Sequence, residues 1–312
     1  MSTQVRSILA QPERLELVVA DDGSSDRTLE LVRQQVAGVA RNDVSVHYLP
    51  ANGRLGVTAN FERAVRAVRS DLVALSDQDD RWHDGRLERL VARFDSEPSL
   101  LLVFTDADLV DGSGEPLGST LFAFLELGEN EREELRRGDA FVAFIRRNLA
   151  TGATVVFRRQ LLTAALPFPT SWVHDEWLAA IAAALGGVGL VEEPTIDYRL
   201  HDANQIGMRA PTLRHKVSRV LEPRGERNRI LAERFEVLAE RLDGIPGVPE
   251  EWRAAAHSKA AFERRRAGLS RNRLLRLGPV LRMALSGRYG RFASRGRADV
   301  LRDLLQPGRP SA

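Results

Sequence analysis

The stretch LELVVADDGSSDRTLEL, residues 15–31, decides the predicted fold, because it has the pattern of a strand, a tight turn and the start of a helix. Its first six residues are apolar apart from one glutamate, as expected for a strand. Asp21 and Asp22 follow directly, and Gly23 permits a tight turn because it has no Cβ atom. The serine and aspartate residues after this glycine are common N-caps, so we expect a helix over residues 28–39.

The same alternation continues as far as residue 105. Further strands are expected at residues 44–49, 72–75 and 100–104, with helices at 57–68 and 87–94 between them. Strands that alternate with helices are typical of βαβ units, so the sequence predicts an α/β fold with a mostly parallel sheet flanked by helices. In such open sheets, ligands bind beyond the carboxyl ends of the strands.

The second half of the chain is less regular. We expect a helix at 139–148, a turn and a strand at 151–159, a buried helix at 172–185 and a strand at 196–200. Beyond Pro211 the pattern is helical, with breaks at 246–249 and at Gly268. The predicted domains are an α/β domain over residues 1–210 and a helical, arginine-rich extension over residues 211–312.

The net charge of +2 conceals a strong asymmetry along the chain. Residues 253–312 hold 15 basic and 3 acidic side chains, whereas residues 1–252 hold 30 basic and 40 acidic ones. An acidic body with a basic end suggests two tasks in one chain. Three interpretations of the basic part remain open: contact with an anionic membrane surface, a solvated or oligomeric face, and nucleic-acid binding, which the absence of a known module disfavours.

Composition excludes several classes of site. The chain has no cysteine, so disulfides, thiolate metal sites and a cysteine nucleophile are excluded. The longest nearly apolar window, residues 178–191, has 14 residues and three glycines, which is too short for a membrane span. The residues after Met1 lack the charged and apolar pattern of a secretory signal. We therefore expect a cytoplasmic location, peripheral on the inner face of the membrane if the basic region contacts lipid.

Two acidic groups fall at the ends of predicted strands. In ADDGSSD, residues 20–26, the carboxylates either cap a turn, or Asp22 accepts a hydrogen bond from a nucleobase. In SDQDDRW, residues 76–82, one interpretation is a solvated acidic turn that Arg81 and Arg86 neutralise. Alternatively, the D-x-D triplet serves a divalent cation that bridges a diphosphate. Both groups lie at one expected sheet edge, which favours a ligand site over two unrelated turns.

Six motifs carry a resemblance to a known family. In chain order they are ADDGSSDRT, NGRLGVTANFERAV, LSDQDDRW, TGATVVFR, HDEWLA and YRLHDANQIG. Their order and spacing, over about residues 7–208, resemble those of family-2 glycosyltransferases with the GT-A fold. The match looks closest to bacterial rhamnosyltransferase-like members that build surface polysaccharides. Six ordered motifs are specific to the family, although they do not identify a sugar.

The resemblance implies transfer of a sugar, rhamnose being one candidate, from a nucleotide-diphosphate sugar donor to a hydroxyl of a glycan or lipid-linked acceptor, with inversion. It also implies a divalent cation, Mg²⁺ or Mn²⁺, with Asp79 and His201 as ligands. Asp175 of HDEW matches the family's general base, which would take the proton of the acceptor hydroxyl. A role in capping its helix is the simpler alternative for this residue.

The other expected site residues also follow from the positions of the motifs. Asp22 matches the residue that recognises the nucleobase, Asp77 the carboxylate near the ribose, and Arg199 a cation near the phosphates. On the donor side we further expect Asp21, Gly23 and Arg54, and as supporting or acceptor-side residues Asp80, Thr151, Gly152 and His174. The structural alternatives are an ion pair for Arg199, a tight turn at Gly152 and a buried core position for His174.

Two functions from other classes remain as alternatives. One is a non-catalytic nucleotide-sugar-binding protein. The other is a sugar nucleotidylyltransferase, which would need a glycine-rich, basic phosphate loop near the start of its sequence, and the present sequence shows none. Binding of a nucleotide sugar without turnover would favour the binding protein.

The chain departs from the family at its beginning. A member of the family normally has a buried central strand and a nucleobase-binding loop about 20 residues before the segment that starts at Arg6 here. We therefore expect Met1 to be an internal or misassigned start. The genomic DNA upstream tests this expectation, because an in-frame stop codon immediately before Met1 would contradict it.

Overall fold

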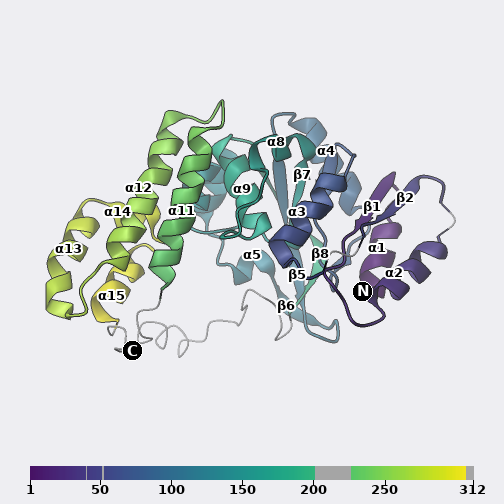
Figure 1. Ribbon diagram of the computed structural model, residues 1–312, viewed down its shortest axis with the longest axis horizontal. Helices are drawn as coiled ribbons and strands as arrows, with labels where there is room; N and C mark the ends of the chain where they lie inside the picture. The colour runs from purple at the N-terminus through teal and green to yellow at the C-terminus, as the bar shows by residue number, and fades with distance from the viewer. Residues whose placement is uncertain (40, 51–52, 201–225, 307–312) are drawn as a thin grey trace. The chain divides into compact units, whose positions relative to one another are not determined.

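The computed structural model describes residues 1–39, 41–50, 53–200 and 226–306 (Figure 1). The chain forms two compact units. The first comprises Met1–Ala140 and Leu149–Met208, and the second comprises Phe141–Asn148 and Arg209–Ala312. The predicted boundary between residues 210 and 211 falls outside the described residues, so its position stays a prediction. In the described parts, no helix is both long and apolar enough to cross a bilayer.

The first four elements form a small layer of helices on a pair of strands. They are α1 (Ser2–Leu9), β1 (Leu15–Val19), α2 (Thr28–Ala37) and β2 (Val44–Tyr48). β1 and β2 pair in parallel, with Leu15 opposite Val44. Val5 and Leu9 of α1 pack with Val32 of α2 in a buried cluster, which explains the apolar positions of both helices. The βαβ unit predicted around residues 15–31 is therefore confirmed.

The main sheet of the first unit contains six strands with helices around it. Its strands are β3 (Leu72–Ala74), β4 (Arg81–Trp82), β5 (Leu102–Val110), β6 (Pro116–Thr120), β7 (Val156–Arg158) and β8 (Val188–Arg199). The order is β3-β7-β5-β8-β4, and β6 pairs with the outer part of β5. The helices are α3 (Val57–Ala67), α4 (Arg86–Ser96), α5 (Leu121–Phe124), α6 (Glu129–Arg136), α8 (Leu162–Ala165) and α9 (His174–Ala184), with 3₁₀ turns at Gly152–Thr154 and Arg159–Leu161.

The main sheet is mixed, not mostly parallel as the sequence predicted. Within the six strands, β5 and β8 pair in parallel, whereas β7 runs antiparallel to both β3 and β5. β4 and β6 are also antiparallel to their neighbours. Apolar periodicity reveals where a strand lies but not the direction in which a distant strand pairs with it. The predicted α/β class with a helical extension is confirmed.

Helix α9 confirms the prediction of a buried helix. Its residues are apolar on nearly all sides, and Trp177, Leu178 and Ile181 are completely enclosed. Such a helix needs protein on every face, and it packs against α3, α8 and strands β5 and β8. The burial fixes the position of the helix start, where His174 and Asp175 lie.

A cavity of about 280 Å³ is lined by residues of both β1 and β3, including Leu15, Leu17, Leu72 and Ala74. Within the described residues, β1 pairs with β2 alone and β3 pairs with β7 alone, so each has one edge without a strand. The lining is largely apolar, as it is around a central strand that is buried on both faces. The family's opening strand was expected at the centre of the sheet, and its place in this molecule stays a prediction.

The second unit is helical, as predicted. Its long elements are α11 (Arg227–Asp243) and α12 (Glu250–Ala267), which lie side by side (Figure 1). They are followed by α13 (Arg273–Leu285), α14 (Arg288–Phe292) and α15 (Arg297–Leu305), and the short helix α7 (Ala140–Phe144) starts at the boundary of the unit. The breaks predicted at 246–249 and Gly268 fall between α11, α12 and α13.

Candidate functional site

Four aspartates of the first unit lie near enough to Tyr198 for their charges to act on its hydroxyl. Asp77, Asp79 and Asp80 lie on the segment between β3 and β4, and Asp175 lies in the first turn of α9. Burial raises the pKa of Tyr198, and the negative charges of all four aspartates raise it further. The fold therefore brings together two motifs that are almost a hundred residues apart in the sequence.

Three of these carboxyl groups hold their protons more tightly than usual. Burial raises the pKa of Asp77 to about 6, with the charge of Asp79 as the second cause. Burial likewise raises the pKa of Asp80 to about 8 and that of Asp175 to about 7, and the charge of Asp77 contributes to both. Buried carboxylates that repel one another have this signature, and it marks a place where a cation would be favourable.

Asp80 lies deepest in this group, with 2% of its surface exposed. Its Oδ1 accepts a hydrogen bond of 3.1 Å from the backbone N–H of Arg199. Its Oδ2 is buried and has no hydrogen-bond partner in the part of the chain that the structure describes. A buried carboxylate oxygen without a donor is costly, so Asp80 provides a second sign that positive charge belongs here.

The two arginines that follow the acidic segment do not form ion pairs with it. Arg81 donates to Asp197 at 2.6 Å. Arg86 is buried, and its guanidinium donates to the hydroxyl of Thr195 and to the carbonyl of Ala153. Burial lowers the pKa of Arg86 to about 9 while the charge of Asp80 opposes this shift. Arg86 thus offsets the charge of Asp80 only from a distance. The structure does not form the solvated turn in which both arginines neutralise the acidic segment.

Asp175, the predicted general base, is held by two backbone donors. Its Oδ2 accepts from the N–H of Gly152 at 2.8 Å, and its Oδ1 accepts from the N–H of Glu176 at 2.7 Å. Gly152 lies close to this carboxylate, since a Cβ atom there would be 3.4 Å from it, at the edge of ordinary contact. Thr151 starts the same 3₁₀ turn and accepts from Thr154. Asp175 therefore joins the helix start to this turn as well as facing Asp77.

His174 has the environment of a buried core residue. Its ring stacks on Phe61 of α3, with the ring centroids 3.7 Å apart. Burial lowers its pKa to about 3, so the imidazole is neutral. Neither ring nitrogen has a hydrogen-bond partner among the described residues. This environment favours the interpretation of His174 as a buried core residue. Its Nε2 atom lies near Gly152.

The turn that follows β1 was expected to contact the nucleobase, and it is held together by hydrogen bonds between its own residues. The Asp21 carboxylate accepts from the N–H groups of Gly23 and Ser24, and the hydrogen bonds with Ser24 lower its pKa although burial opposes this. Asp22 accepts from the N–H groups of Leu55 and Gly56 at 2.6 and 3.0 Å, next to the start of α3. Both carboxylates therefore already have protein donors, and their role toward a nucleobase stays a prediction.

Gly23 and Arg54 lie against each other in this region. Gly23 has a φ of +85°, which favours glycine, and a Cβ atom there would lie 3.2 Å from the Arg54 side chain. Arg54 is exposed. Asn60 of α3 donates to the carbonyl of Ala20 at 2.8 Å, which ties the helix to the end of β1.

Arg199, at the end of β8, holds the acidic segment in place. Its Nε donates to the carbonyl of Asp79 at 3.0 Å, and its Nη1 donates to the carbonyls of Asp111 and Gly112 at 3.1 and 2.9 Å. These bonds connect the acidic segment with the turn between β5 and β6. The other predicted late residue, His201, lies outside the described residues.

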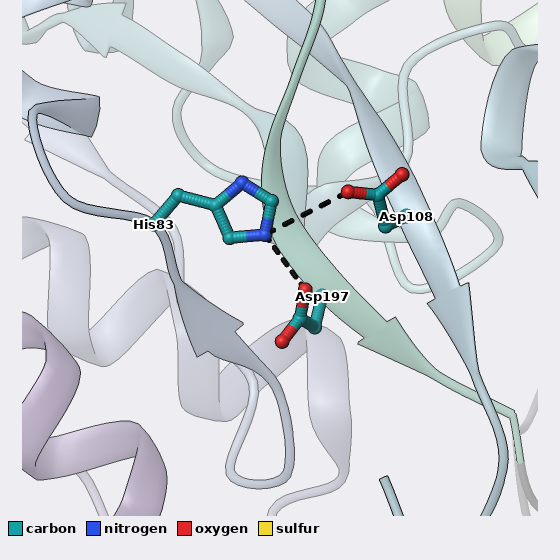
Figure 2. A group of neighbouring side chains, drawn as sticks. All are labelled: His83, Asp108 and Asp197. Atoms are coloured by element: carbon teal, nitrogen blue, oxygen red, sulfur yellow. Dashed lines mark hydrogen bonds and ion pairs between the residues drawn. The ribbon is translucent and has the colours of Figure 1, made fainter. Parts of the chain in front are cut away.

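The structure also contains a group that the sequence did not suggest. His83, Asp108 and Asp197 lie close enough for one atom of each to ligate a common metal ion (Figure 2). The Nε2 atom of His83 is 2.7 Å from Asp197 and 4.0 Å from Asp108. The three residues are far apart in the sequence and meet because β5 and β8 are neighbours with β4 at the edge. Asp197 also pairs with Arg81, so ion pairing alone explains this group.

The sequence profile of "Glycosyl transferase family 2" matches residues 3–161, just over half of the chain. An uncharacterized glycosyltransferase of Nostoc sp. is 26% identical over 209 residues, covering 65% of this chain and 62% of the Nostoc protein. The chain thus spans less than two thirds of that relative's length.

Two further similarities concern proteins with more specific names. The putative teichuronic acid biosynthesis glycosyltransferase TuaG of Bacillus subtilis is 26% identical over 202 residues, covering 63% of this chain and 72% of TuaG. The solved structure of a mannosyltransferase from Pyrobaculum calidifontis, in complex with GDP-Man and Mn²⁺, aligns with a TM-score of 0.48 at 18% identity, over 96% of this chain and 80% of that one. On the match of the family profile, the chain belongs to glycosyl transferase family 2.

Proposed function

We propose that the protein is an inverting, metal-dependent glycosyltransferase that acts at the aspartate cluster around Tyr198. The observation that carries this proposal is the set of raised pKa values at Asp77, Asp80 and Asp175 in a member of this family. A cluster of buried acids with unmet negative charge is suited to a cationic ligand and to proton transfer near neutral pH.

The residues present fit a divalent cation such as Mg²⁺ or Mn²⁺. Such ions prefer carboxylate oxygens and leave positions for phosphate oxygens and water. Asp79 is the proposed ligand, with His201 as a second one, and the partnerless Oδ2 of Asp80 supplies negative charge close by. When bound, the cation offsets the negative charge of the diphosphate and of these carboxylates.

Asp175 is the proposed general base. A base with a pKa near 7 is about half deprotonated at neutral pH and can accept a proton from a hydroxyl. In the proposed reaction the acceptor oxygen forms a bond to the anomeric carbon as the bond from that carbon to the diphosphate oxygen breaks. The hydroxyl proton passes to Asp175, and the nucleoside diphosphate leaves on the opposite side, so the configuration inverts.

Membership of this family also suggests a donor, an acceptor and a location for the protein. We propose a nucleotide-diphosphate sugar as donor, with rhamnose as one candidate, and a glycan or lipid-linked acceptor in surface polysaccharide synthesis. The name of the Bacillus subtilis relative, which concerns teichuronic acid biosynthesis, supports the acceptor class. We also propose a cytoplasmic location with peripheral contact to the inner membrane face.

The position of the cation can be tested against the second candidate group. In a thermal-shift screen of UDP-, GDP- and dTDP-sugars, the wild-type protein is expected to be stabilised only when Mn²⁺ is present. Asp79→Ala is expected to abolish this joint stabilisation, because it removes the proposed ligand. His83→Ala serves as the matched control and is expected to retain it. Loss in His83→Ala with retention in Asp79→Ala would move the cation site to the His83 group.

The burial of Asp80, together with repulsion from Asp77 and Asp79, predicts how the metal-free protein responds to pH. Because the folded-state pKa of Asp80 is raised above its usual value near 3.8, its contribution to stability is greatest below that value and is lost as pH rises toward about 8. Asp80→Asn is therefore expected to raise the melting temperature in EDTA, and more at pH 8.5 than at pH 5.5. A gain of about 2–4 °C would correspond to roughly 1 kcal/mol. Equal effects at both pH values, measured by calorimetry, would contradict the prediction.

The role of Asp175 predicts a separation of binding from transfer. Asp175→Asn is expected to bind the donor with Mn²⁺ as the wild type does, while kcat for transfer falls by about 10²–10⁴-fold. Glu176→Gln is the matched control, since the charge of Glu176 helps to raise the pKa of Asp175. It is expected to retain transfer and to shift the acidic limb of the pH–rate profile to lower pH. Transfer at the wild-type rate in Asp175→Asn would remove this residue as the base.

A further inference from the structure

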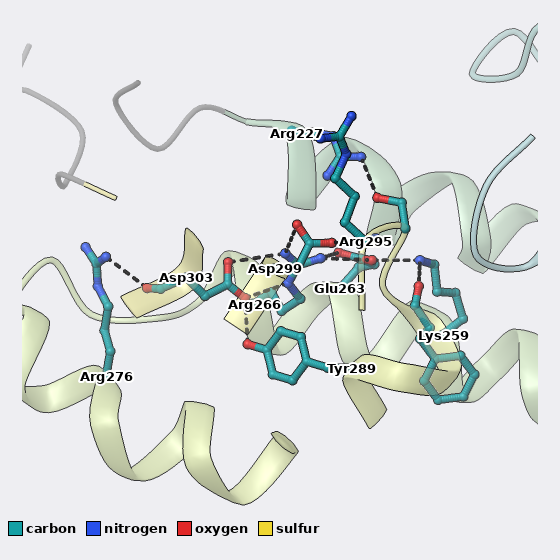
Figure 3. Close-up of polar contacts among 11 residues, drawn as sticks. Arg227, Lys259, Glu263, Arg266, Arg276, Tyr289, Arg295, Asp299 and Asp303 are labelled. Atoms are coloured by element: carbon teal, nitrogen blue, oxygen red, sulfur yellow. Dashed lines mark hydrogen bonds and ion pairs between the residues drawn. The ribbon is translucent and has the colours of Figure 1, made fainter. Parts of the chain in front are cut away.

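All three acidic residues of the basic C-terminal region are buried inside the second unit. Glu263, Asp299 and Asp303 are each at most 2% exposed. They lie between helices α12 and α15 with a group of basic side chains around them (Figure 3). In the net charge of the region these three acids offset three of the basic residues. Because they are buried, they do not contribute negative groups to its surface.

The buried acids are paired with buried cations. Arg266 donates from Nε to Asp303 at 2.7 Å and from Nη1 to Glu263 at 3.1 Å. Lys259 donates to Glu263 at 2.8 Å. Tyr289 adds a hydrogen bond of 2.6 Å to Asp303. Since each partner is buried with its counter-charge, the network is satisfied and acts as a structural centre for the unit.

The consequence is a surface with charge of one sign. Over the described part of residues 253–306 no acidic side chain is exposed, because the region's only acids are the three in the network. The exposed basic residues of this part are Arg264, Arg265, Arg271, Arg273, Arg282, Arg291 and Arg295. Arg264 pairs with Glu236 of α11, whereas Arg273 and Arg282 belong to α13.

Helix α13 adds an apolar stripe to this cationic surface. Leu274, Leu277, Leu281 and Leu285 follow one another at intervals of three, four and four residues, so they share one face of the helix. They are 74%, 44%, 50% and 87% exposed. The buried residues of α13 are Arg276, Val280 and Met283, which lie on another face. A helix with one face in the core and a second leucine face in solvent needs a second partner.

We propose that the leucine face of α13, with the arginines beside it, binds an anionic lipid surface. The charge is complementary, since residues 253–306 present exposed arginines and no exposed acids, which favours negatively charged headgroups. The leucines supply the apolar face that an interfacial helix inserts at the boundary of headgroups and acyl chains. Leu301 and Leu305 of α15 are also exposed and would add to the same contact if they reach the membrane.

The same observations disfavour two other occupants. Nucleic acid would match the arginines but offers no apolar surface for a row of four leucines. A second copy of the chain would match the leucines, but pairing the same face twice would bring arginines against arginines. An anionic membrane satisfies both the charges and the leucines.

The proposal is tested by co-sedimentation of the full chain with vesicles, in the absence of any sugar donor. Vesicles of phosphatidylcholine with about 30% phosphatidylglycerol are compared with vesicles of phosphatidylcholine alone. We expect the wild type to bind the anionic vesicles at least about tenfold more tightly, and less tightly as salt rises. This measurement does not depend on the proposed transferase activity.

Two double variants separate the contributions. Leu274→Ser with Leu285→Ser removes the most exposed leucines, and Arg273→Glu with Arg282→Glu reverses charge on the same helix. Each is expected to weaken binding by at least about tenfold without a change in melting temperature, since the four residues are exposed. Ile230→Ser on α11, an exposed apolar residue of the same unit, is the matched control and is expected to bind normally.

Three results would overturn the proposal. The first is no binding of the wild type to anionic vesicles. The second is unchanged binding of the leucine variant to anionic vesicles, which would indicate attraction by charge alone. Tighter binding of the wild type to duplex DNA or RNA than to vesicles would likewise assign the surface to nucleic acid. The third is a concentration-dependent dimer in size-exclusion chromatography that the leucine variant abolishes, which would assign the face to a second copy.

Discussion

Burial of carboxylates close to one another, near Tyr198, is the constraint on which the candidate site depends. Burial raises the pKa values of Asp77, Asp80 and Asp175 to between about 6 and 8, and the charge of Asp77 adds to the shifts of Asp80 and Asp175. Groups coupled in this way share protons, so the folded cluster needs either bound protons or an added cation. A site that gains stability by accepting positive charge suits the metal ion proposed above.

The arginines near the acidic segment of the first unit also bind groups outside its carboxylates. Arg81 pairs with Asp197, and Arg86 and Arg199 direct their guanidinium groups to carbonyl and hydroxyl oxygens. In the second unit, Glu263 and Asp303 each form an ion pair with a buried basic side chain. The first unit thus buries acids whose pKa values rise, whereas residues 253–306 of the second unit enclose their acids and leave arginines exposed.

Many elements could be predicted from local pattern alone. Strand β1, helices α2 and α3 and the buried helix α9 lie within a few residues of the expected ranges, because apolar periodicity and turn residues specify them. The short strands β4 and β6 and the first helix α1 were missed, since each carries too few apolar positions to stand out. The antiparallel directions of β7 and β4 were also missed, because pairing between distant segments leaves no periodic signal.

The sequence by itself determined the family, the α/β class and the residue types at the site, because ordered motifs such as SDQDDRW and HDEW are local and contiguous. Only the tertiary structure decided which of these side chains meet. It placed Asp175 with Asp77 around Tyr198, gave the Asp22 carboxylate to the backbone of Leu55 and Gly56, and enclosed the acids of the basic region. The physical reason is that burial and long-range contacts set the charge state of an acid, and neither can be read from its neighbours in the chain.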